Sequence, residues 1–332
     1  MSKLWSKYKV FILVVTGVIM VAVGFLAATC AGAKQISLNI IYQSIFHYDE
    51  TNIDMMLVRD SRMPRVVASI LVGGMLALCG ACMQGITRNP IADPTILGMS
   101  QGATLAVALC TVTFKIAGAG SVVVAMLGAV VSGAFVLLIS VRNASSMNVS
   151  RLLLAGTAAS TFLLALASTV ALLGNRSQEL AFWVAGGFGN TNWNDVRILL
   201  IYGLVCCFGI ILLSGKINIL SIGEEMAIGL GVQPSRLRIV SVLLMIPICA
   251  SCVSVSGNIV FVGLIIPHII RKLVGNDYRK ILSLSFLYGA VLLVWADILA
   301  KMINTPYETP IGLFTSILGV PFFLMMVREE RG

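Results

Sequence analysis

Two Cys-x-x-Cys pairs are the first residues in this chain that could do chemistry. They are Cys79 with Cys82 and Cys249 with Cys252, and in a soluble loop this spacing can hold zinc or run thiol–disulfide exchange. Both pairs lie inside long apolar stretches with no histidine nearby. A free cysteine in such a stretch behaves as a small apolar residue. The pattern therefore favours packing over metal or redox chemistry.

Charges inside the apolar stretches are a second set of candidates. Asp297 lies in the run LLVWADILAK, and Lys301 follows four residues later. An ionisable residue in a membrane span is a candidate for proton transfer by default. Residues four apart share a helix face, however, and opposite charges there can pair. The spacing favours a structural ion pair near the outer surface over a proton relay.

Arginine is concentrated at the start of one long apolar run. The segment 59–65 holds Arg59, Arg62 and Arg65, and the apolar run that follows ends in a polar Asn-Pro and Asp-Pro turn at residues 89–94. A new apolar run begins directly after this turn. A span with cations at its mouth and two prolines at its end is typical of a helix that moves against its neighbours, as transport requires.

Motifs for bond chemistry are missing from the sequence. It contains no GxxxxGK[ST] phosphate loop, no GxSxG nucleophile turn and no HExxH metal motif. It has only two histidines, His47 and His268; His268 could ligate haem iron, but its apolar setting favours a structural role. We expect no catalytic residue, cofactor or metal site in this chain. Energy for transport would come from an ion gradient or from a separate subunit.

The composition is that of a membrane protein. Hydrophobic residues make up 58% of the 332 residues and charged residues 11%, and the mean hydropathy is +0.98. A soluble domain carries about 25% charged residues. The apolar runs are continuous rather than alternating, which favours helices over a barrel. We predict an all-α polytopic membrane protein with a single transmembrane domain over residues 1–332.

Ten apolar stretches are long enough to cross a bilayer, which takes about 20 residues per helix. The first follows a basic segment and is longer than the roughly 7–15 residues of a signal-peptide core, so we interpret it as a membrane helix. The predicted spans are 10–29, 64–86, 94–114, 120–141, 151–173, 195–214, 236–254, 257–275, 281–303 and 309–327.

Lysine and arginine are shared unevenly between the two sides of these spans. With the amino end inside, the inner segments hold 15 cations and the outer segments 8. Inner loops of membrane proteins are enriched in cations, and an even number of spans returns the carboxyl end to the inner side. We expect a multi-pass protein of the cell membrane, in contact with the lipid bilayer, with both termini in the cytoplasm.

Several helix ends and short helices are predicted from local signals. Asp93-Pro94 is an N-cap followed by proline at the first helical position. The outer segment 175–195 is long and should hold a short helix. In the inner segment 215–238, Ser221 and Glu224 have capping-box spacing. A short cytoplasmic helix is therefore expected from about residue 223 to 230.

Eight segments, in this order along the chain, resemble the permease subunit of FecCD-type ABC importers, a family that takes up iron-siderophores, haem and cobalamin. The segments are RMPR (62–65), GGMLALCGACMQG (73–85), RNPIADPTILGMSQGA (88–103), SRLLLAGTAAS (150–160), FWVAGGFGNTNW (182–193), GEEMAIGLGV (223–232), GNIVFVGLIIPHIIRKLVGNDYR (257–279) and ETPIGLFTSILGVPFF (308–323). The resemblance covers nearly the whole chain and is specific to the family, but it does not identify the cargo. It implies the type II ABC importer permease fold, with about ten transmembrane helices.

The resemblance also implies roles for residues at the outer face. In the family, arginines of the R-x-P-R segment and a cation on the ninth helix meet carboxylates of an extracellular binding protein. The matching positions are Arg62, Arg65 and Lys301. Lys301 stands where close relatives have arginine, so bidentate pairing would be lost there. The alternative is that these long side chains snorkel at the membrane interface.

Gates and a coupling helix are implied at the inner face. Asn89 and Ile91 match the inner gate loop, and Val149 and Ser150 match a second gate, with valine where a relative has a hydroxyl residue. Ordinary loop capping is the alternative at both places. Residues 223–232 resemble the helix that sits in a groove of the ATPase, although a solvated loop helix would look similar. The expected ATPase contacts are Glu224, Glu225, Met226, Ala227, Leu230 and Gly231.

The resemblance therefore implies a non-catalytic permease of an ATP-driven importer. Its expected partners are a second permease subunit, identical or paralogous, two ATP-binding cassette subunits and an extracellular substrate-binding protein. No nucleic-acid partner is expected. A ferric siderophore is the first choice of cargo, with haem or cobalamin as alternatives. A secondary transporter driven by an ion gradient is the rival class.

Overall fold

The computed structural model describes residues 2–114, 119–143, 146–147, 149–305 and 307–329, and these residues are mostly helical. The only strands among them are β1 (Val141–Asn143) and β2 (Ser146–Met147), which pair antiparallel. The helices are α1 (Ser2–Cys30), α2 (Leu38–Phe46), α3 (Ile53–Met56), η1 (Leu57–Arg62), α4 (Met63–Thr87), η2 (Pro94–Leu97), α5 (Met99–Thr113), α6 (Ala119–Ser140), α7 (Val149–Leu173), α8 (Ser177–Ala185), α9 (Trp193–Ile198), η3 (Leu199–Leu204), α10 (Val205–Leu212), α11 (Ser214–Ile222), α12 (Glu224–Gly229), α13 (Pro234–Ser256), α14 (Val262–Val274), α15 (Tyr278–Met302) and α16 (Ile311–Glu329).

The predicted fold class is confirmed, because each of the ten predicted spans corresponds to a helical segment. Seven helical segments in the described residues are long and apolar enough to cross a membrane. The other three predicted spans correspond to shorter helical stretches: α5 with 15 residues, α14 with 13, and the apolar part of α16. One predicted span, 195–214, is built from α9, η3 and α10 in succession.

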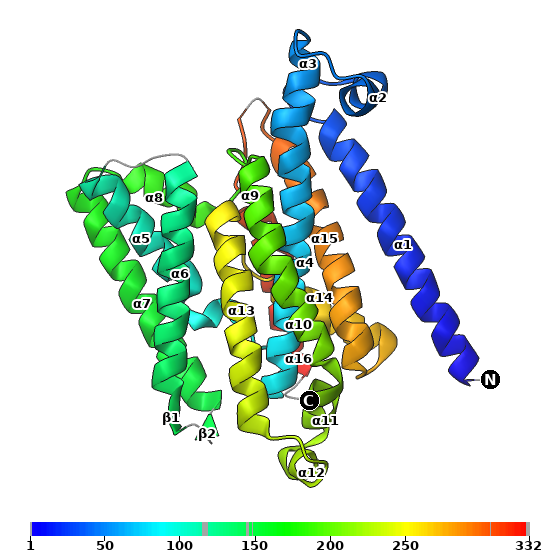
Figure 1. Ribbon diagram of the computed structural model, residues 1–332, viewed down its shortest axis with the longest axis vertical. Helices are drawn as coiled ribbons and strands as arrows, with labels where there is room; N and C mark the ends of the chain where they lie inside the picture. Colours follow the sequence, from blue (N-terminus) through cyan, green and yellow to red (C-terminus); the bar gives the residue numbers. More distant parts are fainter. Residues whose placement is uncertain (1, 115–118, 144–145, 148, 306, 330–332) are drawn as a thin grey trace.

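Helix α4 lies at the centre of the bundle (Figure 1). Nearly every residue along it is buried. Glycine allows its neighbours to approach closely: a Cβ at Gly73 would overlap the carbonyl of Gly289 in α15, and one at Gly80 would overlap that of Gly263 in α14. Small residues allow this approach between helices in lipid. On either side of α4, α1 packs against α15 and α13 packs against α6.

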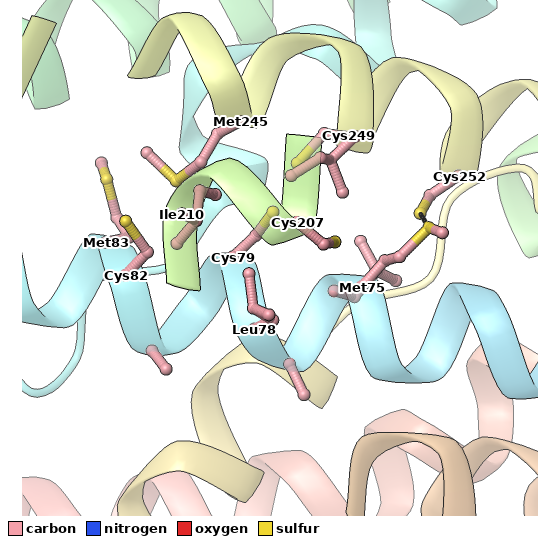
Figure 2. Packing of buried hydrophobic residues seen from close by; sticks show 14 of the residues in the cluster. Met75, Leu78, Cys79, Cys82, Met83, Cys207, Ile210, Met245, Cys249 and Cys252 are labelled. Carbon is pink, nitrogen blue, oxygen red and sulfur yellow. Dashed lines mark hydrogen bonds between the residues drawn. The ribbon is translucent and has the colours of Figure 1, made fainter. Parts of the chain in front are cut away.

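Sulfur-containing side chains fill much of the core between α4, α10 and α13 (Figure 2). Cys252 Sγ lies 3.8 Å from Met75 Sδ, and Cys79 and Cys82 are fully buried close by. All eight cysteines are free. Within the described residues, no group of three or more His, Cys, Asp or Glu side chains is placed to hold a metal ion. The two Cys-x-x-Cys pairs thus lie in packed helix interfaces.

Two predicted spans begin later than the sequence indicated. The span expected at 94–114 starts as the 3-10 turn η2, and the α-helix begins only at Met99, after Gly98 with a φ of 72°. The span expected at 257–275 becomes helical only at Val262, because Gly257 (φ 67°) and Phe261 (φ 70°) are left-handed. Apolar composition continued through both breaks, so it did not mark them.

The short helices predicted outside the spans are present as α8 and α12. The capping box predicted at Ser221 is wrong. The Ser221 hydroxyl donates to the carbonyl of Asn218 at 2.7 Å, and α12 begins after Gly223 without a side-chain cap. Residues 215–222, predicted to be part of the inner loop, belong to α11, which brings this hydroxyl back onto the preceding turn. Helices α11 and α12 lie at the end of the bundle opposite α2 and α3 (Figure 1).

Candidate functional site

The end of the bundle where α2 and α3 lie, which the sequence predicts to face outward and which is called the outer end below, contains a network of four charged side chains. Arg65 at the start of α4 donates from Nη2 to Asp297 Oδ1 at 2.8 Å and from Nε to the same oxygen at 3.1 Å. Lys301 Nζ lies 2.7 Å from Asp297 Oδ2. Arg65 Nη1 also forms an ion pair with Glu308, in the segment that leads into α16. Two cations and two carboxylates therefore balance each other within one chain.

Three of the four side chains in this network are almost completely buried, so the network contributes to the stability of the fold. The Asp297 side chain is fully buried, and those of Arg65 and Lys301 are each 8% exposed, whereas Glu308 is 51% exposed. The pairing of Asp297 with Lys301, predicted from their spacing, is confirmed. The sequence did not reveal the third partner, because Arg65 lies 232 residues before Asp297. Removing one member of such a buried network leaves an uncompensated charge, which costs about 3–5 kcal/mol.

Arg62 has a different set of partners from Arg65, although the two are only three residues apart. Its Nη1 donates to the carbonyls of Thr29 at 2.7 Å and Cys30 at 2.9 Å, and its Nη2 donates to the carbonyl of Lys34. These carbonyls belong to the last residues of α1 and the loop after it, where intrahelical donors run out. Arg62 thus closes the carboxyl end of α1.

The three cations expected to dock a binding protein are therefore all engaged inside the chain. Arg65 and Lys301 are brought together through Asp297, and Arg62 stands apart from them. Exposed cations at this end include Lys34, which pairs with Asp54, and Arg59, whose guanidinium lies 4.1 Å from the centre of the Tyr48 ring. The exposed carboxylate of Glu308 is the part of the network that a partner could reach.

The first predicted gate is a tight polar turn after α4. Arg88 ends α4 in the left-handed conformation with a φ of 54°. The Asn89 side chain accepts the backbone N–H of Ile91 at 3.0 Å, and Asp93 accepts that of Thr95 at 2.8 Å. Burial raises the pKa of Asp93, against the effect of its hydrogen bonds with Thr95. Side-chain capping thus fixes this turn, as loop capping alone would also do.

The second predicted gate, Val149 and Ser150, is the first turn of α7. It follows the β1–β2 hairpin at the same end of the molecule as α12 (Figure 1). The first gate turn leads into η2, and Gly98 at the end of η2 lies against Ser160 of α7. The two gate segments are therefore linked through the contact of η2 with α7.

The predicted coupling helix is α12, which projects from the end of the bundle opposite α2 and α3, the predicted inner end (Figure 1). Its apolar side chains face outward: Met226 is 59% exposed, Ile228 63% and Leu230 62%. Glu224 and Glu225 are exposed as well. Sequence reasoning named Met226 and Leu230 but missed Ile228 and Ile222, which is 64% exposed. Which apolar residues of a short loop helix face outward depends on the anchoring of that helix.

Two of the expected contact residues serve α12 itself. Ala227 is completely buried in the chain's own core, so it is not accessible to a partner in this conformation. Gly231, with a φ of 78°, ends the helix: its N–H donates to the Ile228 carbonyl at 3.0 Å, and the N–H of Val232 donates to the Ala227 carbonyl at 2.8 Å. This is the Schellman arrangement, which favours glycine at its left-handed position.

Arg238 connects α12 to the rest of the bundle, and sequence reasoning missed it. This α13 side chain is 6% exposed and forms an ion pair with Glu224. Its Nε donates to the carbonyl of Ile86 at 3.0 Å. Ile86 is in the last turn of α4, directly before the gate turn at Asn89. The only sequence signal was an arginine in the first turns of an apolar helix, which positive-inside enrichment already explained.

The inner end of α4 is also bonded to the helices on its other side. Gln84 Nε2 donates to the carbonyls of Gly263 and Leu264 in α14 at 3.3 Å, and Gln84 Oε1 accepts Arg271 Nη2 at 2.9 Å. The same Arg271 nitrogen lies 3.1 Å from the hydroxyl of Tyr278 in α15. The end of α4 that precedes the gate turn is therefore bonded to α13, α14 and, through Arg271, α15.

Among the described residues, seven helices are long and apolar enough to cross a membrane. The model of the FecCD transport family matches residues 19–329. This chain is a member of the FecCD transport family. The expectation from sequence is thereby confirmed.

Curated relatives in the FecCD family are permeases for iron complexes. The chain is 38% identical to the iron(3+)-hydroxamate import system permease protein FhuB of Bacillus subtilis (strain 168), over 98% of this chain and 86% of that one. It is 35% identical to the Fe(3+) dicitrate transport system permease protein FecC of Escherichia coli (strain K12), with 82% and 83% covered. The ferric enterobactin transport system permease protein FepD of the same strain is 34% identical, with 90% of each chain covered.

A solved structure agrees with this membership. An inward-facing ABC transporter of the metal-chelate type matches with a TM-score of 0.83 and 28% identity, over 96% of this chain and 99% of that one. The chain is accordingly an integral-membrane ABC permease. FecCD permeases are generally non-catalytic, and the family implies a complex with ATPase and substrate-binding partners.

Proposed function

We propose that this permease imports a ferric siderophore, which an extracellular binding protein delivers and which ATP hydrolysis in a separate subunit drives across the membrane. The observation that carries the proposal is α12, which exposes Met226, Ile228 and Leu230 beyond the membrane spans. An exposed apolar patch of this kind marks an interaction site. The iron cargo is inferred from relatives that are named for iron complexes.

The inner end would receive the force. Glu224, Glu225, Met226 and Leu230 would contact a groove of the ATPase, with Ile222 and Ile228 extending the apolar surface. Ala227, buried beneath α12, and Gly231, at its end, would hold the helix in the orientation that the ATPase requires. Both termini of the chain would lie on this cytoplasmic side, as the excess of cations there supports.

Arg238 would carry the movement of α12 to the gate. It bonds Glu224 of α12 and the Ile86 carbonyl at the end of α4, three residues before Asn89. A displacement of α12 by the ATPase would therefore pull on the turn that holds Asn89 and Ile91. Val149 and Ser150, at the start of α7, would move with it through the packing of η2 on α7.

At the outer end, a carboxylate of the binding protein would take the place of Glu308 beside Arg65. Glu308 is half-exposed and bonds one nitrogen of Arg65. A carboxylate on the binding protein would replace Glu308 there, while Asp297 keeps Arg65 and Lys301 in place. Arg62 would contribute by fixing the end of α1 under the docking surface. Complementary charge of this kind sets orientation and association rate more than affinity.

The pathway itself would lie between this chain and a second permease subunit. The cargo would need no tight site there, because the binding protein supplies the selectivity. Two permeases, two ATPases and one binding protein would form the complete importer. Whether the second permease is a copy or a paralogue follows from purifying the assembly with a tag on this chain alone and identifying the permeases recovered.

The proposal is tested by reconstituting the permease with its ATPase and binding protein in vesicles. ⁵⁵Fe-labelled siderophore should accumulate only with ATP inside the compartment equivalent to the cytoplasm. A matched assembly carrying an ATPase without its catalytic carboxylate should show none. Uptake at the full rate without ATP, driven by a proton or sodium gradient, would establish a secondary transporter instead. Uptake of haem or cobalamin but of no ferric siderophore would replace the cargo.

A further inference from the structure

An open apolar groove lies on the outside of the bundle between α10 and α15. It has a volume of about 460 Å³ and is lined by Leu204, Val205, Cys207, Phe208, Ile211 and Phe286. This volume falls within the roughly 300–1,000 Å³ of small-molecule sites. The lining carries no charged side chain. Because α10 and α15 both belong to membrane spans, the groove opens within the hydrocarbon part of the bilayer.

Close packing of Phe286 against α4 forms the floor of the groove. The Phe286 ring lies over Gly74 of α4, so closely that any Cβ at Gly74 would overlap it. Because Gly74 has no side chain, the Phe286 ring can pack directly against α4. Phe208 on the opposite wall remains 63% exposed. One aromatic ring is fixed by packing, and the other is left for an occupant to cover.

Two exposed cations, Arg279 and Lys216, lie toward the α12 end of the bundle from the residues that line this groove. Arg279 is seven residues before Phe286, so both lie on one face of α15 about 10 Å apart along the axis. Lys216 follows Ile211 by five residues and lies near the start of α11. A Cβ at Gly215 would lie only 3.4 Å from Arg279 Nη2, so the guanidinium rests against the start of α11 beside Lys216.

Neither of these cations is neutralised by a carboxylate in the part of the chain that the structure describes. Arg279 and Lys216 are exposed, and no carboxylate in the described residues lies within ion-pair distance of either side chain. The nearest acid in the sequence, Asp277, is already used: it pairs with Lys280 at 3.6 Å, accepts Asn218 Nδ2 at 3.0 Å and caps α15. The groove is apolar and opens in hydrocarbon, and the two cations near it have no carboxylate partner among the described residues. An anionic phospholipid matches both features.

We propose that the groove between α10 and α15 binds a phospholipid with an anionic headgroup, with an acyl chain against Phe208 and Phe286 and the phosphate between Arg279 and Lys216. Basic pockets between membrane helices bind such headgroups in general. The acyl chain covers apolar surface that α10 otherwise leaves open, and the headgroup neutralises the cations. This site is independent of the cargo and of the partners proposed above.

The test uses the permease in its purified assembly, stripped of lipid and titrated with phosphatidylglycerol or with phosphatidylcholine of the same acyl chains. Bound lipid is counted by native mass spectrometry. Each cation near an anionic headgroup contributes about fivefold in affinity, so the double variant K216Q/R279Q should bind phosphatidylglycerol about 30-fold more weakly. R236Q, which removes another exposed cation on α13, a helix that contributes no residue to the lining of the groove, is the matched control and should leave the affinity unchanged.

A second variant guards against misfolding of the first. Ile211→Trp fills the groove without changing charge, and it should weaken binding of phosphatidylglycerol while the assembly stays intact. Equal binding of the two lipids, or an affinity that neither variant changes, would overturn the proposal. Displacement of the lipid by inorganic phosphate alone would also overturn it, because the acyl chain would then contribute nothing.

A photo-crosslinking residue at position 208 identifies the occupant directly. A crosslink to phospholipid in native membranes supports the site. A crosslink to a polypeptide means that a second permease or another protein covers the groove, and it would overturn the lipid assignment.

Discussion

The two ends of the bundle handle charge and apolar surface in opposite ways. At the outer end, Arg65, Asp297, Lys301 and Glu308 neutralise one another inside the chain. At the inner end, α12 leaves Met226, Ile228 and Leu230 more than half exposed. The charged network at the outer end is balanced within the chain, whereas the apolar side chains of α12 are left uncovered by the described residues. This difference favours transient docking outside and lasting attachment inside, because buried apolar contacts hold subunits together while exposed charge mainly guides encounter.

The buried cations at the two ends of the bundle have different roles. Arg62 and Arg65 fasten α1, α4 and α15 together, so their first task is stability. Arg238 fastens α12 to α4, so it connects an exposed helix to the central helix of the bundle.

The largest effect is expected for Asp297→Asn. It removes the charge that holds Arg65 and Lys301 together, leaving the buried Lys301 without a carboxylate partner and Arg65 with only the half-exposed Glu308, and it should cost about 3–5 kcal/mol of stability. Thermal unfolding in detergent measures this loss. The control is Glu179→Gln, which breaks the exposed pair of Glu179 with Arg176 and should cost at most about 1 kcal/mol. Equal stability of the two variants would show that the outer network is not what fixes α4 to α15.

The next effect is expected at α12. Met226→Asp places a charge at the centre of the exposed apolar surface and should weaken attachment of the ATPase by about 30-fold, corresponding to a loss of about 2 kcal/mol. Co-purification of the ATPase at graded concentrations measures this. Ile53→Asp changes an apolar side chain that is 78% exposed at the outer end and serves as the control. If both variants retained the ATPase, the exposed apolar side chains of α12 would not be its attachment site.

A smaller effect is expected for Arg238→Gln, which breaks the link between α12 and α4. Loss of a hydrogen bond to a charged group costs about 1.5–3 kcal/mol, and we expect uptake to fall about tenfold while ATP hydrolysis continues. The ratio of cargo transported to ATP hydrolysed is the measurement. The double variant E224R/R238E restores the ion pair but not the donor to Ile86, so it should recover coupling only in part. A parallel loss of hydrolysis and uptake would instead assign Arg238 to assembly.

The smallest effect is expected for Glu308→Gln. It frees one nitrogen of Arg65 for the binding protein and should tighten docking by at most about fivefold, since a surface ion pair contributes up to about 1 kcal/mol. The effect should shrink as salt is added. Glu50→Gln makes the same change in net charge at an exposed outer acid and frees no arginine. If both variants bound the partner equally, Glu308 would not compete for Arg65.

Local patterns in the sequence predicted much of the fold. Continuous apolar runs located all ten spans, and the spacing of Asp297 and Lys301 predicted their ion pair. The breaks at Gly98 and Phe261 were not predictable in this way. They occur where another chain segment approaches: Gly98 lies against Ser132 and Ser160, and the Phe261 ring fills the space beside Gly319. Hydropathy contains no information on such approaches.

For the functional residues, the sequence by itself determined that cations cluster at one mouth of the bundle and that a short helix with acidic and apolar residues stands at the other. Tertiary structure alone decided which of them are available. It turned Arg65 toward Asp297, buried Ala227, and joined Arg238 to both Glu224 and Ile86. The physical reason is that a buried charge must find an opposite charge or carbonyl within hydrogen-bond reach. The folded packing of distant segments, and not their order along the chain, provides that partner.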